Sequence, residues 1–462
     1  MADQALNHDD APDWRRFLAD GRGLRLSGLL AVVVLHAGGN YAVITLAPAI
    51  VADVGGGALI GALTALFNIT TVLAAAAVGP LAGRFGPGPL LSAMTAASLL
   101  GALLSAGATS MTAVALGRAL AGFGGGGLLA LAYIAMRAET TAAAFPKLSA
   151  LTGAFWIGAA FAGPLLGGLL ADLIGWRPAF VLIGGLSLAY ALANRRTIAG
   201  TGVERISEHF PAMAFAAFGV GVALISFAPL FGTGVGLAMA AAGLCCLLGA
   251  ALRERRRAPR MFPTNAFRVA TEQGGALAAK TVLGASAMSV LVFGPLLLIQ
   301  VHGHSATFAG AFVLIETLSW SVGSFIAASL RAGRLLAMLG PLVSMAGLAG
   351  CAVFLIDGHL IGAGLSIAAC GLGLGMAWPF LGARIIAGDT EEERAKTMAM
   401  ISSVETLGFA VGGALVGLAG SLAVGGAVEG ADAVSRAAQT GILVSMPLAL
   451  LGAWLSLNVL RR

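Results

Sequence analysis

Residues 162–168 read Ala-Gly-Pro-Leu-Leu-Gly-Gly and lie inside an apolar run that extends from 147 to 171. Membrane helices tolerate glycine, because small residues let helix backbones approach each other closely. Pro164 predicts a kink in this helix, and Gly163, Gly167 and Gly168 predict a flat face without side chains. Such a face would let two groups of helices pack tightly in one state and rock apart in another. The alternative interpretation is a general packing seam of small residues.

The composition of the whole chain points to the same environment. The 462 residues are 58% hydrophobic and only 10% charged, and the mean hydropathy is +0.93. A soluble globular protein has about 25% charged residues, so this chain has too few charges to cover a surface that faces water. The composition excludes soluble, fibrous and disordered proteins and predicts a chain that faces lipid.

The chain contains fourteen apolar runs, and a membrane-spanning helix needs ~20 apolar residues. Most loops between the runs are short, and the least distinct boundary lies between the seventh and the eighth. The runs occupy residues 27–51, 57–80, 89–107, 111–135, 147–171, 177–194, 210–230, 233–252, 275–300, 306–329, 334–356, 360–385, 397–421 and 438–459. The expected fold is therefore an all-α integral membrane protein with 14 transmembrane helices.

The placement of lysine and arginine predicts the orientation of these helices. With both termini in the cytoplasm, all but four of the 27 Lys and Arg residues fall in cytoplasmic segments. Arg177 and Arg436 fall in outer segments, and Arg118 and Lys280 fall within helices. This asymmetry favours an even number of helices. It also gives the net charge of +6 a role in topology, so we expect no nucleic-acid partner.

Two longer cytoplasmic stretches, 195–209 and 253–274, flank the seventh and eighth runs. We expect a cytoplasmic N-terminal tail (1–26), a six-helix bundle (27–194), a linker with two extra transmembrane helices (195–274) and a second six-helix bundle (275–462). Two such halves are typical of transporters built from repeats, which bind substrate at the membrane midplane between the halves. The polar, acidic N-terminus, MADQALNHDDAPDW, is unlike a signal peptide, and the expected location is the bacterial inner membrane.

Several stretches resemble motifs of one family. Residues 79–86, Gly-Pro-Leu-Ala-Gly-Arg-Phe-Gly, are similar to the loop signature Gly-x-Leu-Ala-Asp-Arg-x-Gly-Arg-Lys of the major facilitator superfamily, with matches that include Gly79, Arg84 and Gly86. Arg118 begins a stretch similar to the Arg-x-x-x-Gly-x-Gly of that superfamily's antiporters. Residues 163–168, followed by Gly-Trp-Arg-Pro-Ala-Phe at 175–180, resemble the antiporter motif Gly-Pro-x-x-Gly-Gly.

The resemblance implies the major facilitator fold, with two six-helix bundles plus a two-helix insert. Residues 298–310 and 407–412 extend it to the fourteen-helix drug/proton antiporter family, over roughly 27–460. It implies a conformational role for Gly79, Arg84, Gly86, Gly163, Pro164, Gly167 and Gly168. The alternative for 79–86 is a Gly/Pro turn with one arginine that sets topology.

The sequence departs from that family at two places. Gly83 stands where the loop signature has an aspartate that helps to latch the halves together on the cytoplasmic side. Gly39 stands where the drug exporters have an aspartate in the first helix, nine residues before Pro48. Neither the usual latch nor the usual proton site can therefore be assumed.

Two glutamates lie inside membrane runs, where a charge costs about 2.5–3.5 kcal/mol and needs a reason. Glu316 lies ~15 Å into the tenth run, at the midplane, with Trp320 on the same helix face. Glu405 lies in the thirteenth run. We expect Glu316 and Glu405 to be the groups that bind the coupled proton, and of the two we favour Glu316. The alternative is that each is permanently paired, for example with Lys280 or Arg118.

The expected substrate cavity involves His36, Asn40, Arg118, Lys280 and Trp320. His36 and Asn40 form an i,i+4 pair near the centre of the first helix. Arg118 lies ~10 Å inside the outer end of the fourth helix, and Lys280 lies near enough to the cytoplasm to snorkel. Partial snorkelling is the alternative for Arg118, and a hydrogen-bonded packing role is the alternative for His36.

The first functional hypothesis is a proton-coupled secondary active transporter that exports small amphipathic compounds by alternating access. The second is an importer of a vitamin or small aromatic metabolite on the same scaffold, favoured by Gly39 and the altered loop signature. A membrane enzyme or sensor has little support, because the sequence contains no HExxH, GxSxG or Walker motif. We expect no enzymatic activity, cofactor or metal site; the expected partners are a small-molecule substrate, protons and the bilayer, and the expected state is a monomer.

Overall fold

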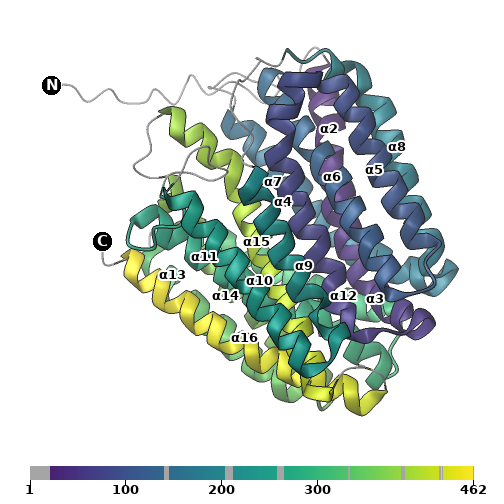
Figure 1. Cartoon of the computed structure of the whole chain (residues 1–462). Coiled ribbons are helices and arrows are strands. Elements are labelled where there is room, and N and C mark those ends of the chain that lie inside the picture. Colours follow the sequence, from purple (N-terminus) through teal and green to yellow (C-terminus); the bar gives the residue numbers. More distant parts are fainter. Residues whose placement is uncertain are drawn as a thin grey trace.

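The structure is a computed structural model that describes residues 21–139, 145–202, 212–256, 265–330, 333–386, 391–425, 428 and 430–460. Every regular element in these ranges is helical, and 14 helical spans are long and apolar enough to cross a membrane. Each apolar run of the sequence overlaps one of these spans (Figure 1). The prediction of an all-α membrane protein with 14 transmembrane helices is therefore confirmed.

The first six spans form one group of helices, here the N-terminal half. The first span is interrupted by a π-helical turn, and the second begins with a 3-10 turn. The elements are α2 (Arg22–Val33), η2 (Val34–Gly38), α3 (Gly39–Val54), η3 (Gly57–Leu59), α4 (Ile60–Phe85), α5 (Pro87–Ala106), α6 (Met111–Glu139), α7 (Phe145–Ile174) and α8 (Trp176–Ala199).

The last six spans form the C-terminal half, and two further spans precede it. The preceding pair is α9 (Ala212–Phe227), continued by η5 (Ala228–Phe231), and α10 (Gly232–Arg256). The C-terminal half contains α11 (Glu272–Leu296), η6 (Leu297–Val301), α12 (Ala306–Ser329), α13 (Gly333–Gly350), η7 (Cys351–Leu355), α14 (Leu360–Ile386), α15 (Glu391–Val424) and α16 (Ala431–Leu460).

Local sequence signals explain where several of these helices begin. Gly86 (φ 85°) and Gly175 (φ 82°) adopt positive φ values that favour glycine, and they separate α4 from α5 and α7 from α8. Thr271 caps α11 by accepting a hydrogen bond from the backbone N–H of Gly274, and Ser305 caps α12 by accepting one from Phe308.

One sequence-based location is corrected by the structure. We expected residues 79–86 to form a loop between the second and third spans, but α4 continues through Phe85 and the turn is reduced to Gly86. Pro80 is accommodated inside the helix. The motif therefore occupies the last turns of a helix, and its glycines do not open a flexible loop.

The two halves meet through α4 against α15 and through α7 against α12. We call the end where α2 begins and α16 ends the terminal end, and the opposite end the far end. At the far end one hydrophobic core includes Ile50 and Leu59 of the N-terminal half and Phe293 and Val428 of the C-terminal half. The core at the terminal end of the N-terminal half, which includes Leu26 and Met136, draws its buried residues from that half. At the far end the two halves therefore share one core.

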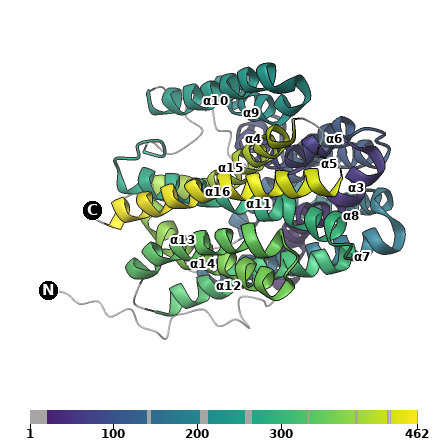
Figure 2. The same ribbon diagram turned by 90° about the horizontal axis from the view of Figure 1, so that it is seen from below.

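The α9–α10 pair lies at one edge of the molecule (Figure 2). Helix α9 contacts both α4 and α15, and its residues Phe218 and Ile225 share a core with Ile69 of α4 and Leu407 of α15. The pair therefore covers the seam between α4 and α15.

Candidate functional site

Arg118 of α6 is held inside the N-terminal half by three neighbours. Its guanidinium donates hydrogen bonds to the Asn40 side-chain oxygen and to the Leu63 carbonyl oxygen (3.3 Å), and its Cζ lies 3.9 Å from the centre of the Phe67 ring. Only 3% of the residue is exposed. The guanidinium is therefore buried and does not snorkel, so that alternative is wrong.

His36 lies in the π-helical turn η2 and shares the Phe67 ring with Arg118. Its ring stacks on Phe67 at 4.8 Å, and its Nε2 lies 3.3 Å from the Thr71 hydroxyl. Gly125 of α6 faces the ring so closely that a Cβ there would come within 2.6 Å of His36 Nδ1. The π-turn is of a kind that often marks functional positions, and here it inserts a histidine between two helices.

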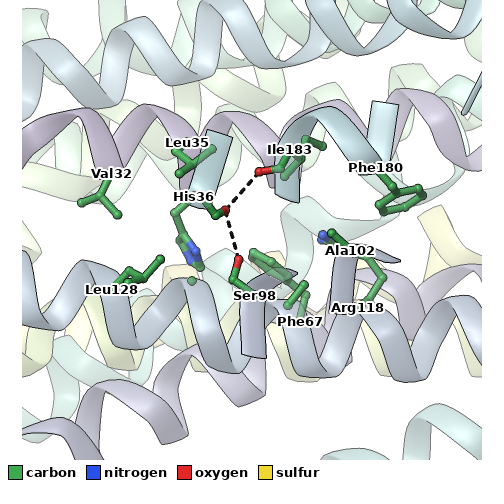
Figure 3. Close-up of a pocket in the computed structure, with 14 residues that line it drawn as sticks. Val32, Leu35, His36, Phe67, Ser98, Ala102, Arg118, Leu128, Phe180 and Ile183 are labelled. Carbon is green, nitrogen blue, oxygen red and sulfur yellow. Dashed lines mark hydrogen bonds between the residues drawn. The ribbon is translucent and has the colours of Figure 1, made fainter. Parts of the chain in front are cut away.

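A small cavity of about 30 Å³ lies beside these residues, enough for one or two water molecules. All its walls come from the N-terminal half, including His36, Phe67 and Arg118 (Figure 3). Its polar lining also includes Ser98, which donates to the Ser187 hydroxyl (3.1 Å), which in turn donates to the Ile183 carbonyl (3.0 Å). Arg118 and His36 thus face the interior of one half.

Lys280 of α11 forms the cationic centre of the C-terminal half. Its side chain is 3% exposed, and Nζ lies 4.4 Å from the centre of the Trp378 ring. Trp320 packs edge to face on Trp378 at 4.7 Å, and Phe409 lies 6.4 Å from Trp320. The lysine is thus turned inward against an aromatic group that is itself partly exposed, instead of snorkelling to the membrane surface.

Glu316 lies near the middle of α12, and 2% of it is exposed. Among the described residues, neither of its carboxylate oxygens has a hydrogen-bond partner. Helix α14 packs directly against the backbone at this level, since a Cβ on Gly371 would lie 2.9 Å from the Glu316 carbonyl carbon. Buried polar groups are nearly always paired, so this carboxyl group is exceptional. In the part of the chain that the structure describes, Glu316 therefore makes no hydrogen bond to Lys280 or Arg118.

An apolar cluster lies between the two halves. Ile44 of α3 packs with Met288 and Leu291 of α11 and Val313 of α12, and the partly buried Tyr41 and Phe409 flank it. Val313 is one turn from Glu316, so the carboxyl group belongs to the layer where the halves meet.

The motif at 162–168 packs on two partners at once. Gly163 faces the first span, where a Cβ would lie 2.6 Å from the Gly38 carbonyl oxygen, and Gly167 faces Ala42 at 2.5 Å. On the other side, Gly168 faces Thr307 of α12 at 2.7 Å, and the Pro164 carbonyl faces Gly310. The glycines therefore provide close packing within one half and between the halves.

The remaining predicted residues are placed less centrally. Arg84 is exposed, with its guanidinium 5.2 Å from the Phe85 ring, and Gly79 is partly exposed inside α4. The side chain of Glu405 lies outside the described residues, although α15 includes this position. For the fully described part of the chain, no group of three or more His, Cys, Asp or Glu residues could hold a metal ion.

Sequence reasoning missed the partners that hold these groups. Phe67 stacks with both Arg118 and His36, and Asp172 of α7 bonds to the start of α12. A phenylalanine in an apolar run gives no signal of such a role. Asp172 does have a sequence signal, because it is an acidic residue four positions after Gly168, at the end of the same apolar run.

The comparisons with known proteins agree with this architecture. The sequence profile of the Major Facilitator Superfamily matches residues 29–413. The "Probable multidrug-efflux transporter" of Mycobacterium tuberculosis is 28% identical over 456 residues, covering 94% of this chain and 95% of that protein. "Multidrug resistance protein 3" of Bacillus subtilis is 29% identical over 168 residues, covering 36% of this chain and 33% of that protein.

Solved structures show the same fold at low identity. A bacterial homolog of the human lysosomal transporter Spinster, in an inward-facing and unoccupied conformation, has a TM-score of 0.66 at 14% identity, covering 96% of this chain and 98% of that chain. The nucleoside transporter NupG has a TM-score of 0.64 at 14% identity, covering 94% and 99%. The fourteen spans, the paired halves and the profile match lead to one conclusion: this chain belongs to the Major Facilitator Superfamily of membrane transporters.

Proposed function

We propose that this protein is a proton-coupled exporter of small amphipathic compounds that works by alternating access, with Glu316 as its principal proton-binding group. The observation that carries the proposal is the Glu316 carboxyl group, buried at mid-helix without a partner for either oxygen among the described residues. A carboxyl group that alternates between a sealed site and water changes its proton occupancy as it does so. Its place at the meeting layer of the halves would couple that change to their movement.

The direction of transport is inferred from the relatives and from the helix α7 motif. Proteins similar to this chain over nearly its full length are named as probable multidrug-efflux transporters. The Gly163–Gly168 face provides the close packing that alternation between two states requires. In this proposal the protein lies in the bacterial inner membrane as a monomer, both termini are cytoplasmic and the far end faces outward. The structure would then represent a state closed to the outside.

Proteoliposomes with a pH-sensitive dye inside would test the coupling. With an imposed pH gradient, wild-type protein should move protons opposite to the substrate, and Glu316→Gln should lose this proton movement. Glu254→Gln is a matched control, because Glu254 is a buried glutamate (3% exposed) in α10, away from the meeting layer. Undiminished substrate-driven proton flux in Glu316→Gln would refute the role of this carboxyl group.

An importer remains the second candidate because of Gly39. Drug exporters that resemble this chain have an aspartate there, and a Cβ on Gly39 would lie 3.4 Å from Cγ2 of Ile183. This is close to ordinary van der Waals contact, so the packing against α8 does not by itself explain the glycine, and the first helix lacks the acid that those exporters use. The same liposomes separate the candidates: protons that move with the substrate, or substrate uptake without proton movement, would favour import.

A further inference from the structure

The amino end of α12 is capped by a residue from the other half of the molecule. Asp172, near the end of α7, accepts hydrogen bonds from the backbone N–H of Ala306 (3.1 Å), the backbone N–H of Thr307 (2.9 Å) and the Thr307 hydroxyl (2.6 Å). The helix's own cap, Ser305, accepts from the next N–H, that of Phe308. The first N–H groups of any helix have no partner within it, and a carboxylate is the strongest kind of acceptor for them.

The backbones of α7 and α12 approach each other closely at this same place. Gly168 lies one helical turn before Asp172 on the same face of α7. A Cβ on Gly168 would lie 2.7 Å from Thr307 Cα, which is closer than real Cβ contacts come. The glycine therefore allows the carboxylate to reach the α12 backbone, and any separation of the two helices at the far end breaks the bonds from Asp172.

A second carboxylate at the far end provides a contrast. Asp53 accepts hydrogen bonds from Trp176 Nε1 (3.1 Å) and from Arg177, and all three residues belong to the N-terminal half. Movement of the halves leaves these bonds intact. The bonds of Asp172, in contrast, exist only while the far end is closed, and an interaction present in one state alone shifts the equilibrium between states.

We propose that Asp172 is a gating residue: its carboxylate caps α12 across the two halves and holds the far end of the transport pathway closed. Opening toward that side requires the release of Asp172 from Ala306 and Thr307. This role depends neither on the direction of transport nor on proton coupling, so it can fail or succeed independently of the proposed function.

Electron–electron double resonance on the full-length protein in lipid nanodiscs tests the proposal. Nitroxide labels at Ile174→Cys of α7 and Ile361→Cys of α14, both exposed at the far end, report the distance between the halves. The four native cysteines, Cys245, Cys246, Cys351 and Cys370, are first replaced by alanine or serine. Asp172→Ala should raise the ratio of the open, long-distance population to the closed one by about tenfold.

Two further variants test whether the change in the distance between the halves is specific to the Asp172 carboxylate. Asp172→Asn keeps one acceptor oxygen and should give a smaller shift in the same direction. Asp53→Ala removes a far-end carboxylate whose bonds lie within one half, and it should leave the distance distribution unchanged. Distributions for Asp172→Ala and Asp172→Asn that coincide with wild type would overturn the proposal, as would an equal shift in Asp53→Ala. If Asp172→Ala fails to fold, Asp172→Asn decides.

Discussion

Two buried ionisable residues of this transporter, Arg118 in the N-terminal half and Glu316 in the C-terminal half, have opposite surroundings. In the N-terminal half, Arg118 bonds to Asn40 and to a backbone carbonyl and lies over Phe67. In the C-terminal half, Glu316 is equally buried, yet neither carboxylate oxygen has a partner in the described part of the chain. The same helical scaffold therefore holds one charge firmly and leaves one acid unpaired.

This contrast separates a structural role from a switching role. A charge with a complete set of partners is stabilised in one form and resists change, because losing any partner leaves a buried group unsatisfied. A group without partners gains or loses a proton with less disruption of its surroundings. Our proposal therefore places proton coupling in the C-terminal half, whereas the contacts of Arg118 connect α6 to α3 and α4 in the N-terminal half.

The largest effect that we expect on stability is that of Arg118→Met. The substitution keeps an unbranched apolar stem but leaves Asn40 and the Leu63 carbonyl without their donor and removes the cation from Phe67. Leaving one buried acceptor unsatisfied costs about 1–3 kcal/mol, and this substitution leaves two, so the thermal unfolding temperature in detergent should fall markedly.

The companion variant Asn40→Leu sharpens this test. If Asn40 is a true partner of Arg118, the double variant should be less destabilised than the sum of the two single variants. Simple additivity of the two effects would contradict the view that Arg118 and Asn40 act as one connected unit.

A smaller effect is expected where the halves meet. Gly168→Ala places a methyl group against the backbone of Ala306 and Thr307, where no space exists. Overpacking of this kind costs about 1–3 kcal/mol, and here it acts on the contact between the halves, so transport rate and unfolding temperature should both fall.

Gly158→Ala is the matched control on the same helix, since nothing lies within 4 Å of a Cβ at that position. It should leave both quantities unchanged or slightly raise stability, because alanine favours the helix. Equal losses in the two variants would mean that α7 is sensitive to any added methyl group, and the particular role of Gly168 would be lost.

Much of this fold could be predicted from the sequence, because lipid imposes a simple rule. Each span must be a long apolar helix, so the run at 306–329 matches α12, and the run at 57–80 starts with the 3-10 turn before α4, although α4 continues to Phe85. Predictions were less accurate where helices continue into polar sequence. Helix α15 begins at Glu391, several residues before the expected run, since backbone hydrogen bonding continues past the apolar limit.

The site was predictable by residue type but not by partner. The sequence singled out Arg118, His36 and Glu316 because charged or polar side chains in apolar runs need a reason. It gave no sign that η2 would turn His36 toward Phe67 and Thr71, because a π-turn changes the helical phase without leaving a sequence signature. Long-range pairs such as Asp172 with Thr307 depend on tertiary contact, which no local pattern encodes.

Glu316→Gln should have the smallest effect on stability, although we expect it to have the largest effect on transport. Glu316→Gln replaces the carboxyl group with an amide of nearly the same size, and among the described residues the carboxyl group has no hydrogen-bond partner to lose. The free energy of unfolding should therefore change by less than about 1 kcal/mol, well below the change for Arg118→Met, in the same thermal unfolding experiment. A loss comparable to that of Arg118→Met would show that Glu316 has a strong partner in the folded protein. The contrast between a held charge and an unpaired acid would then fail, and with it the reason for assigning proton coupling to the C-terminal half.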